Sequence, residues 1–359
     1  MKLSLLTLVS LAIALACASS TFSQTTTRLG ATPTEMRMDQ IVRSYTAANA
    51  FMGVVSVSEG DHVLLDKGYG SADLEWNIPN APDVKFRLGS LTKQFTVALI
   101  LLLQEDGKLD IRNPVSKYLL DAPQTWQKVT LADLMGNTSG IPDFTNFKEF
   151  KAWGMSPHTV EEELEFFKNK PLDFEPGSKW AYSSSNFEIL GAVIEKVTGR
   201  TYGDQLQERI FGPLEMKNTG LDMDGLILAK RAQGYRPGKS GLISVRSLSM
   251  SVPWAAGSMY STTEDLLKWE HALFSGKLLN KDSLKLMLTP GKGSYGLGVY
   301  VFAKKSGITI VTHAGAIAGF KTSLTYVPDE RIAIAVLSNV EGEATNSITD
   351  QLLTEALKQ

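Results

Sequence analysis

Ser90 and Lys93 are the two residues of this sequence whose types and spacing best suit covalent chemistry. Residues three positions apart lie on the same face of a helix, so the Lys93 amine can reach the Ser90 hydroxyl. A serine that opens a helix has an unpaired backbone N–H and the positive end of the helix dipole beneath it, which favours a developing oxyanion. Burial lowers the pKa of a lysine, so its amine can serve as a general base. The pair predicts acyl transfer.

The segment after the pair supports this interpretation. Phe95 to Leu103 form an apolar run that is too short to span a bilayer and is typical of a buried helix. Lys93 therefore directly precedes a buried segment. A Ser-x-x-Lys tetrad is common by chance, however, and a serine at a helix start is usually an N-cap. We expect Ser90 to be an N-cap as well as a nucleophile, and other motifs must decide the function.

Two such motifs follow in the chain, Tyr182-Ser183-Ser184 and His313-Ala314-Gly315. Together with Ser-x-x-Lys they resemble the three ordered motifs of serine penicillin-recognising enzymes, which are Ser-x-x-Lys, Tyr-x-Asn and Lys- or His-x-Gly. The flanking segments 134–142 and 255–266 resemble the branch that holds class C β-lactamases, D,D-peptidases, D-aminopeptidases and family VIII carboxylesterases. The resemblance extends from about Phe51 to Asn339.

The resemblance implies roles for particular residues. Ser90 is the implied nucleophile, Lys93 the base for acylation, and Tyr182 the group that carries the proton to the leaving group and activates water. Implied substrate-binding residues are Ser184, His313, Gly315 and Ala316. The N–H of Ala316 would join that of Ser90 as an oxyanion hole, and Gly315 would allow close approach of the substrate.

Two positions depart from the pattern of the branch. Ser184 stands where the tyrosine motif has asparagine, which puts substrate amide recognition and lysine positioning in doubt. Asn137 replaces the usual histidine of its segment, to which we assign a structural role.

No cofactor is predicted. The four histidines show no ligand spacing for a metal. Gly291, Gly293 and Gly296 fit a dinucleotide-binding fingerprint, but they lead into an expected strand where that fingerprint requires a helix.

Composition limits the partners. The 359 residues are 43% hydrophobic and 21% charged, which is ordinary for globular proteins. A net charge of −2 without a basic cluster argues against nucleic acid. The expected partner is a small-molecule ester, amide or peptide substrate, and the sequence does not specify an oligomeric state.

The N-terminus has the pattern of a signal peptide over residues 1–23. Lys2 is followed by an apolar stretch and small residues, with a plausible cleavage site before Gln24. We therefore expect a periplasmic or secreted protein with no transmembrane segment after processing. Lipidation at Cys17 is the alternative, although Ala14 stands where a lipoprotein signal prefers leucine.

The order of elements predicts an α/β (α+β) fold. Apolar periodicity predicts helices over 34–50, from Ser90 onward, and over 160–168, 187–198, 202–211, 263–274 and 344–358. Strands are expected over 53–58, 62–69, 296–302, 308–312, 322–327 and 332–338. Residues 24–108 and 289–359 would form an antiparallel sheet domain flanked by the terminal helices, and residues 109–288 a mainly helical inserted domain, as in β-lactamases and transpeptidases. The catalytic cleft would lie between them.

Three functions remain open from the sequence. The first is an exported serine hydrolase that acts through an acyl-enzyme on small esters or amides, as carboxylesterases do. The second is the same chemistry on D-amino-acid peptides or β-lactams, as in a D,D-carboxypeptidase, D-aminopeptidase or β-lactamase. The third is a poorly catalytic penicillin-binding or sensor protein. This function stays open because Ser184 replaces the asparagine of the tyrosine motif.

Overall fold

The computed structural model describes residues 32–245, 248–304 and 307–358. The predicted signal peptide, the cleavage site before Gln24 and Cys17 lie outside these residues. Within them, no helix is both long enough and apolar enough to cross a membrane.

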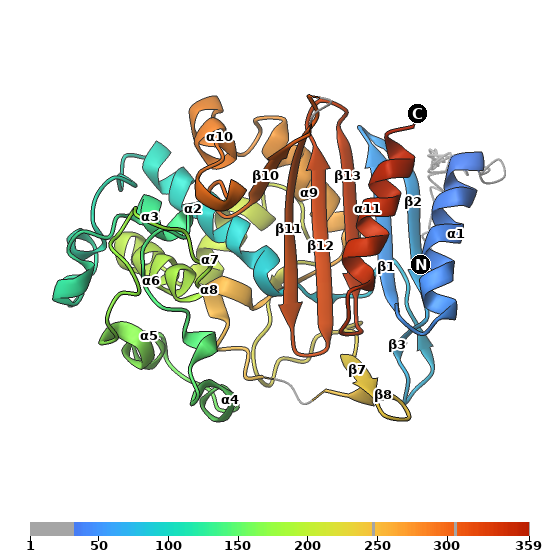
Figure 1. Ribbon diagram of the computed structural model, residues 1–359, viewed down its shortest axis with the longest axis horizontal. Coiled ribbons are helices and arrows are strands. Elements are labelled where there is room, and N and C mark those ends of the chain that lie inside the picture. The colour runs from blue at the N-terminus through green and yellow to red at the C-terminus, as the bar shows by residue number, and fades with distance from the viewer. Residues whose placement is uncertain (1–31, 246–247, 305–306, 359) are drawn as a thin grey trace, which may run out of the picture. The chain divides into compact units, whose positions relative to one another are not determined.

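A six-stranded antiparallel sheet joins the two ends of the chain (Figure 1). Its strand order is β10-β11-β12-β13-β1-β2. The first and last long strands pair directly, with Gly53 opposite Ser338. The strands are β1 (Gly53–Glu59), β2 (His62–Tyr69), β10 (Tyr300–Ala303), β11 (Thr309–Ile317), β12 (Phe320–Val327) and β13 (Ile332–Ser338). The predicted antiparallel sheet is confirmed.

Helices cover both faces of this sheet. The terminal helices α1 (Pro33–Ala47) and α11 (Ala344–Ala356) lie side by side on one face, while α9 (Thr263–Phe274) packs on the other (Figure 1). Because both faces are covered, burial does not alternate along the central strands β12, β13 and β1. Every residue of β13, for example, is buried.

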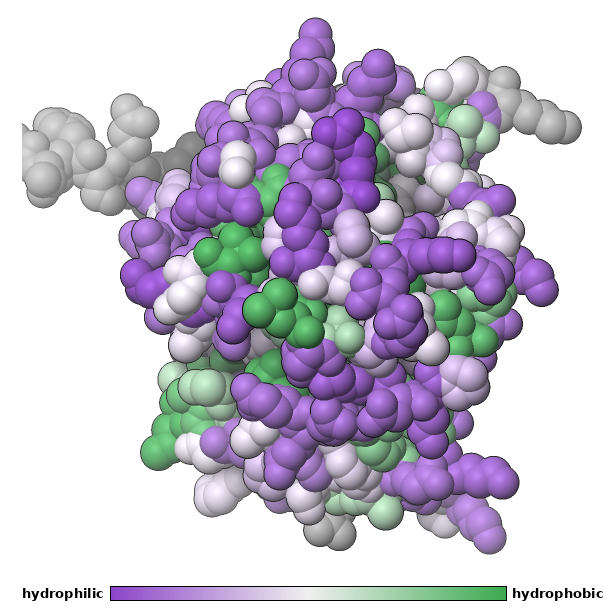
Figure 2. All heavy atoms as spheres, turned by 90° about the vertical axis from the view of Figure 1, so that its left-hand side faces the viewer, coloured by the Kyte–Doolittle hydropathy of each residue, from purple (hydrophilic) through white to green (hydrophobic). Residues whose placement is uncertain are grey.

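The middle of the chain is mainly helical. Its long buried helix is α2 (Thr92–Glu105), which packs on α6 and α8 and stacks Phe95 on Trp269 of α9. The other helices are α3 (Leu131–Met135), α4 (Phe150–Trp153), α5 (Val160–Lys168), α6 (Ser185–Thr198), α7 (Tyr202–Leu206), α8 (Trp254–Gly257) and α10 (Lys281–Leu288). The outer face of this region is largely hydrophilic, with scattered apolar groups (Figure 2). The division into a sheet domain and an inserted domain stays a prediction.

Shorter elements connect these parts. Three minor sheets contain β3 (Ser71–Asp73), β4 (Ile78–Pro79), β5 (Phe86–Arg87), β6 (Gly220–Leu221), β7 (Tyr235–Gly238), β8 (Gly241–Ser244) and β9 (Met259–Ser261). The short 3-10 turns include η1 (Gly89–Leu91) and η4 (Phe144–Asn146). The first of these leads directly into α2.

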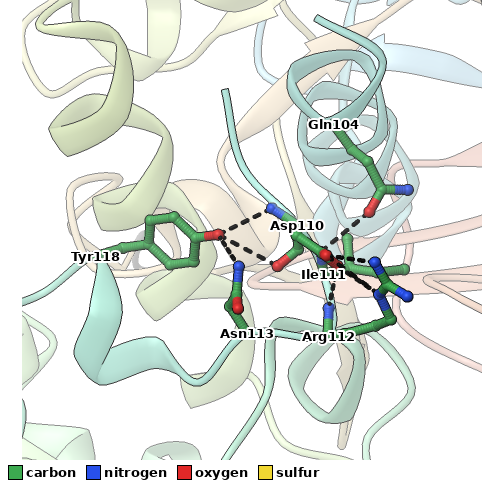
Figure 3. Close-up of polar contacts among 6 residues, drawn as sticks. All are labelled: Gln104, Asp110, Ile111, Arg112, Asn113 and Tyr118. Carbon is green, nitrogen blue, oxygen red and sulfur yellow. Dashed lines mark hydrogen bonds and ion pairs between the residues drawn. The ribbon is translucent and has the colours of Figure 1, made fainter. Parts of the chain in front are cut away.

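A polar network closes the loop after α2 (Figure 3). The Tyr118 hydroxyl accepts hydrogen bonds from the amide of Asp110 at 2.8 Å and from Asn113 Nδ2 at 3.0 Å. Gln104, in the last turn of α2, accepts from the amide of Ile111 at 3.0 Å. These bonds fix the C-terminal end of the helix whose first turn carries Lys93.

Several predicted boundaries were wrong. The first strand after the helical region begins at Tyr300 and not at residue 296, because Gly298 has a φ of 74° and residues 297–299 form a bend. β11 continues to Ile317 instead of ending at residue 312, since its pairing with β12 runs on until Ile317 faces Phe320. The expected helix over 202–211 changes to a π-helical turn at residue 207.

Candidate active site

Ser90 lies in η1, two residues before α2 begins. The prediction that Ser90 is an N-cap was wrong. The N-cap positions of η1 and α2 are Leu88 and Leu91, and neither makes a side-chain cap. A 3-10 turn inserted ahead of the helix moves the cap position past the serine, so the Ser90 hydroxyl is available for other partners.

Lys93 supplies one of those partners. Its Nζ donates to Ser90 Oγ at 3.0 Å and to the carbonyl of Ala256 at 2.9 Å. Its side chain is among the largest fully buried ones, and the Tyr182 and Phe187 rings lie 5.0 and 5.2 Å from Nζ. Burial lowers the pKa of Lys93 to about 8, against the opposing effect of nearby carboxylates. The amine is thus positioned and tuned to take a proton from Ser90.

Tyr182 is the second partner of Ser90: both line the same cavity, and the interaction with Ser90 lowers the pKa of Tyr182 against the larger effect of burial. Burial raises the pKa of Tyr182 well above its usual range, so the side chain is a neutral phenol near neutral pH. Asn137 holds the segment that carries the tyrosine. It accepts the amide of Ser183 on Oδ1 at 3.1 Å, and its own carbonyl accepts the amide of Ala181 at 3.0 Å. This agrees with a structural role for Asn137.

Two glycines let the Ser90 turn pack tightly against β11. Gly89 has a φ of 56°, and a Cβ added there would lie 2.8 Å from the nitrogen of Ala316. A Cβ on Gly315 would lie 1.9 Å from the carbonyl oxygen of Leu88. The carbonyl of Leu88 thus approaches Gly315 closely, and the expected approach of substrate at Gly315 stays a prediction. This packing brings Ser90 and Ala316 together, as an oxyanion hole requires.

His313 lies inside β11, not at its end, and is 3% exposed. Burial and the positive charge of Lys93 lower the pKa of His313 to about 3, so the ring is neutral. Its Nδ1 lies 2.7 Å from the carbonyl of Ala314, which can only accept, so Nδ1 carries the proton. Nε2 then accepts from the Tyr295 hydroxyl at 3.1 Å.

A cavity of about 430 Å³ opens at Ser90. It is lined by Gly89, Ser90, Lys93, Asp143, Phe144, Thr145, Phe150, Tyr182, Ser184, Leu248, Val252, Pro253, Ala256, Gly257, Ala316, Ile317 and Ala318. The structure thus brings together Ser90, Lys93, Tyr182, Ser184 and Ala316. His313 and Gly315 are not among these lining residues, and their role in substrate binding stays a prediction.

Sequence reasoning missed part of this cavity. Asp143 and Phe144 directly follow the segment 134–142, so their place beside a family-like motif was an available signal. Phe150, Leu248 and Val252 carry no such signal, because they reach the cavity only through the packing of distant loops. Among the described residues, no group of three His, Cys, Asp or Glu side chains is arranged to hold a metal ion.

Comparison with known proteins identifies the chain. The sequence profile of the beta-lactamase family matches residues 38–358. The chain belongs to the beta-lactamase family. It is accordingly a serine hydrolase with the β-lactamase/transpeptidase-like fold predicted from its motifs.

Relatives span several activities. A penicillin-binding protein from Bacillus halodurans is 26% identical, with a TM-score of 0.79 over 88% of this chain and 98% of that one. D-amino acid amidase from Ochrobactrum anthropi SV3, complexed with D-phenylalanine, is 25% identical, with a TM-score of 0.79 over 91% and 99%. Teichoic acid D-alanine hydrolase of Staphylococcus aureus is 30% identical over 67% of this chain, and the match spans 59% of that protein's length.

Proposed function

We propose that this serine hydrolase forms a covalent acyl-enzyme on small esters or amides whose acyl group carries a free amine, as a D-aminoacyl group does. One observation carries the choice of substrate. Asp143 is the only carboxylate among the described residues that line the cavity, and Lys93 is the only cation. Lys93 is bonded to Ser90, and His313 is neutral and outside the lining.

These charges favour one substrate over another. Asp143 acts electrostatically on both Lys93 and Tyr182, so its charge is felt at the reacting groups. A carboxylate attracts an ammonium group and repels the carboxylate of a D-Ala-D-Ala peptide or a β-lactam. The relatives support this assignment, since one is named for D-alanine hydrolysis from teichoic acid and another for D-amino acid amides. The apolar neighbours Phe144, Phe150 and Val252 would hold the rest of the acyl group.

The proposed reaction has two steps. Lys93 takes the proton of Ser90 as Oγ attacks the carbonyl carbon, and the backbone N–H groups of Ser90 and Ala316 hold the oxyanion. Collapse breaks the bond to the leaving alcohol or amine, which receives the proton through Tyr182. Water then attacks the acyl group, its proton returns to Ser90 Oγ, and the acid is released.

The proposal also includes export of the protein from the cytoplasm. The signal-peptide pattern of residues 1–23 supports action in the periplasm or outside the cell, with lipidation at Cys17 as the alternative. The mass of the N-terminal peptide of the processed protein decides between cleavage before Gln24 and a lipid-modified cysteine.

Asp143→Asn tests the substrate assignment. The amide keeps the acceptor for the amide of Thr145, which Asp143 now binds at 3.1 Å, and removes only the charge. We expect kcat/KM on a D-alanyl ester to fall about 10- to 100-fold, because a hydrogen bond to a charged group contributes about 1.5–3 kcal/mol. On the N-acetylated ester the variant and the wild-type protein should differ little.

Equal losses on both esters would contradict the role of Asp143. Assays of the wild-type protein with a chromogenic cephalosporin and a D-Ala-D-Ala peptide complete the comparison. Faster hydrolysis of either than of the D-alanyl ester would overturn the proposal in favour of β-lactamase or D,D-peptidase activity.

A further inference from the structure

Two glutamates are buried directly behind Lys93. Glu188 of α6 is 0% exposed and Glu163 of α5 is 3% exposed. An ionised carboxylate can only accept hydrogen bonds. If both groups are ionised, the two oxygens of Glu163 and Oε2 of Glu188 have no hydrogen-bond partner. A proton on one of them allows the two carboxyl groups to bond to each other. Burial of such a pair is costly, so its place beside a catalytic lysine calls for an explanation.

Glu188 is connected to Lys93 through a short piece of backbone. Its Oε1 accepts the amide of Ala256 at 3.2 Å, and the carbonyl of the same residue accepts Lys93 Nζ at 2.9 Å. Thr96 Oγ1 donates to the carbonyl of Ala255 at 2.7 Å. Ala255 and Ala256 thus form a short backbone ledge between the two side chains. Glu188 accepts a hydrogen bond from the amide of Ala256, and Lys93 donates one to the carbonyl of Ala256.

We propose that Glu188 is a positioning residue for the hydrolytic reaction: it fixes the Ala255–Ala256 ledge that receives Lys93 and, with a protonated Glu163 behind it, supplies the buried negative charge that balances the lysine. The inference rests on the proposed role of Lys93 as the base. Glu188 and Lys93 do not form a direct ion pair, because the backbone of Ala255 and Ala256 lies between them. Their charges nevertheless interact across this backbone.

The electrostatic effects agree in direction. Burial raises the pKa of both glutamates, and the negative charge of Glu188 raises that of Glu163 further. Lys93 opposes the rise at Glu188, whose pKa is raised only to about 8, so Glu163 holds its proton more tightly and Glu188 is the member that ionises opposite protonated Lys93. In return, the charge of Glu188 raises the pKa of Lys93. The other titratable groups that interact with these residues are Asp143, which also raises the pKa of Lys93, the neutral ring of His313, and the phenols Tyr182 and Tyr202, which burial keeps neutral.

Glu188→Gln tests this role, because glutamine keeps an acceptor for the amide of Ala256 and removes the charge. Hydrolysis needs neutral Lys93, so kcat/KM falls as the lysine is protonated at lower pH. Without the charge that favours protonation, this acid limb should move to lower pH by about half a unit to one unit. We would measure kcat/KM from about pH 5 to about pH 9 on a short-chain p-nitrophenyl ester, which does not titrate itself.

Two variants serve as controls, and a third is a second test. Glu270→Gln removes another buried carboxyl, on α9, whose charge does not contribute to the pKa of Lys93, and it should leave the acid limb in place. Glu163→Gln should also leave it nearly in place, because its amide can still donate to the Glu188 carboxylate. Glu163→Leu removes that donor, which favours protonated Glu188, so its acid limb should move in the same direction as that of Glu188→Gln. It also tests the proposal if Glu188→Gln fails to fold.

An unmoved acid limb in folded Glu188→Gln, or an equal shift in Glu270→Gln, would overturn the proposal. A uniform loss of activity without a shift would also overturn it, since that is the mark of a purely structural residue. Failure of the underlying mechanism looks different. If Lys93 is not the base, folded Lys93→Ala keeps its activity, a result obtained independently of any glutamate variant.

Discussion

Ser90→Ala is expected to lower kcat by at least about 10⁴-fold on the best substrate of the protein, because removing the nucleophile of a covalent mechanism costs up to about 10⁶-fold. No other hydroxyl replaces it. The Ser90 hydroxyl is the one that lies 3.0 Å from Lys93 Nζ, in the cavity that Tyr182 also lines. The measurement is steady-state hydrolysis of a D-alanyl ester and of a p-nitrophenyl ester.

Ser44→Ala provides the matched control. Ser44 is an exposed serine of α1 whose hydroxyl donates only to the carbonyl of Ile41, so its loss should leave turnover unchanged. Thermal unfolding of each variant separates lost catalysis from lost structure. Folded Ser90→Ala with turnover near that of the wild-type protein would show that the acyl-enzyme mechanism is wrong.

Lys93→Met is expected to lower kcat/KM by about 10²- to 10⁴-fold, the usual cost of losing a positioned general base. Combining it with Ser90→Ala should add little to the loss from Ser90→Ala, because the two residues act as a unit. In the wild-type protein the pKa of Lys93 is lowered to about 8, so kcat/KM should rise as the pH increases toward that value. In the variant this dependence should disappear.

The stability of the same variant distinguishes a catalytic lysine from a structural one. Lys93 is 1% exposed, and its amine is desolvated at a cost that methionine of similar length does not incur. We therefore expect Lys93→Met to unfold at the same temperature as the wild-type protein or at a higher one. A variant that is both active and destabilised would contradict the assignment of Lys93 as the base.

Local signals in the sequence predicted many elements accurately. α5 and α9 begin and end where expected, because Thr159 and Thr262 cap their first turns and apolar spacing marks their buried faces. β13 also has the expected bounds, and Pro328 begins the turn that precedes it. These features depend on neighbours within a few residues, which is what a single sequence displays.

Features that depend on distant partners were not predicted. β11 extends past His313 because β12 pairs with it as far as Ile317. The N-cap prediction failed at Ser90, since packing of Gly89 against Ala316 replaces the expected cap with a 3-10 turn. The pairing of Glu163 with Glu188 arises from contact between α5 and α6, and each glutamate alone looks like an ordinary helix residue.

The most direct test of the central claim is the identity of the residue that becomes covalently modified. The protein is treated with a fluorophosphonate, and its intact mass and proteolytic peptides are measured. We predict one adduct per chain, on the peptide that contains Ser90, with labelling slowed in Lys93→Met and absent in Ser90→Ala. An adduct on another residue, or unchanged hydrolysis after complete labelling of Ser90, would contradict the account.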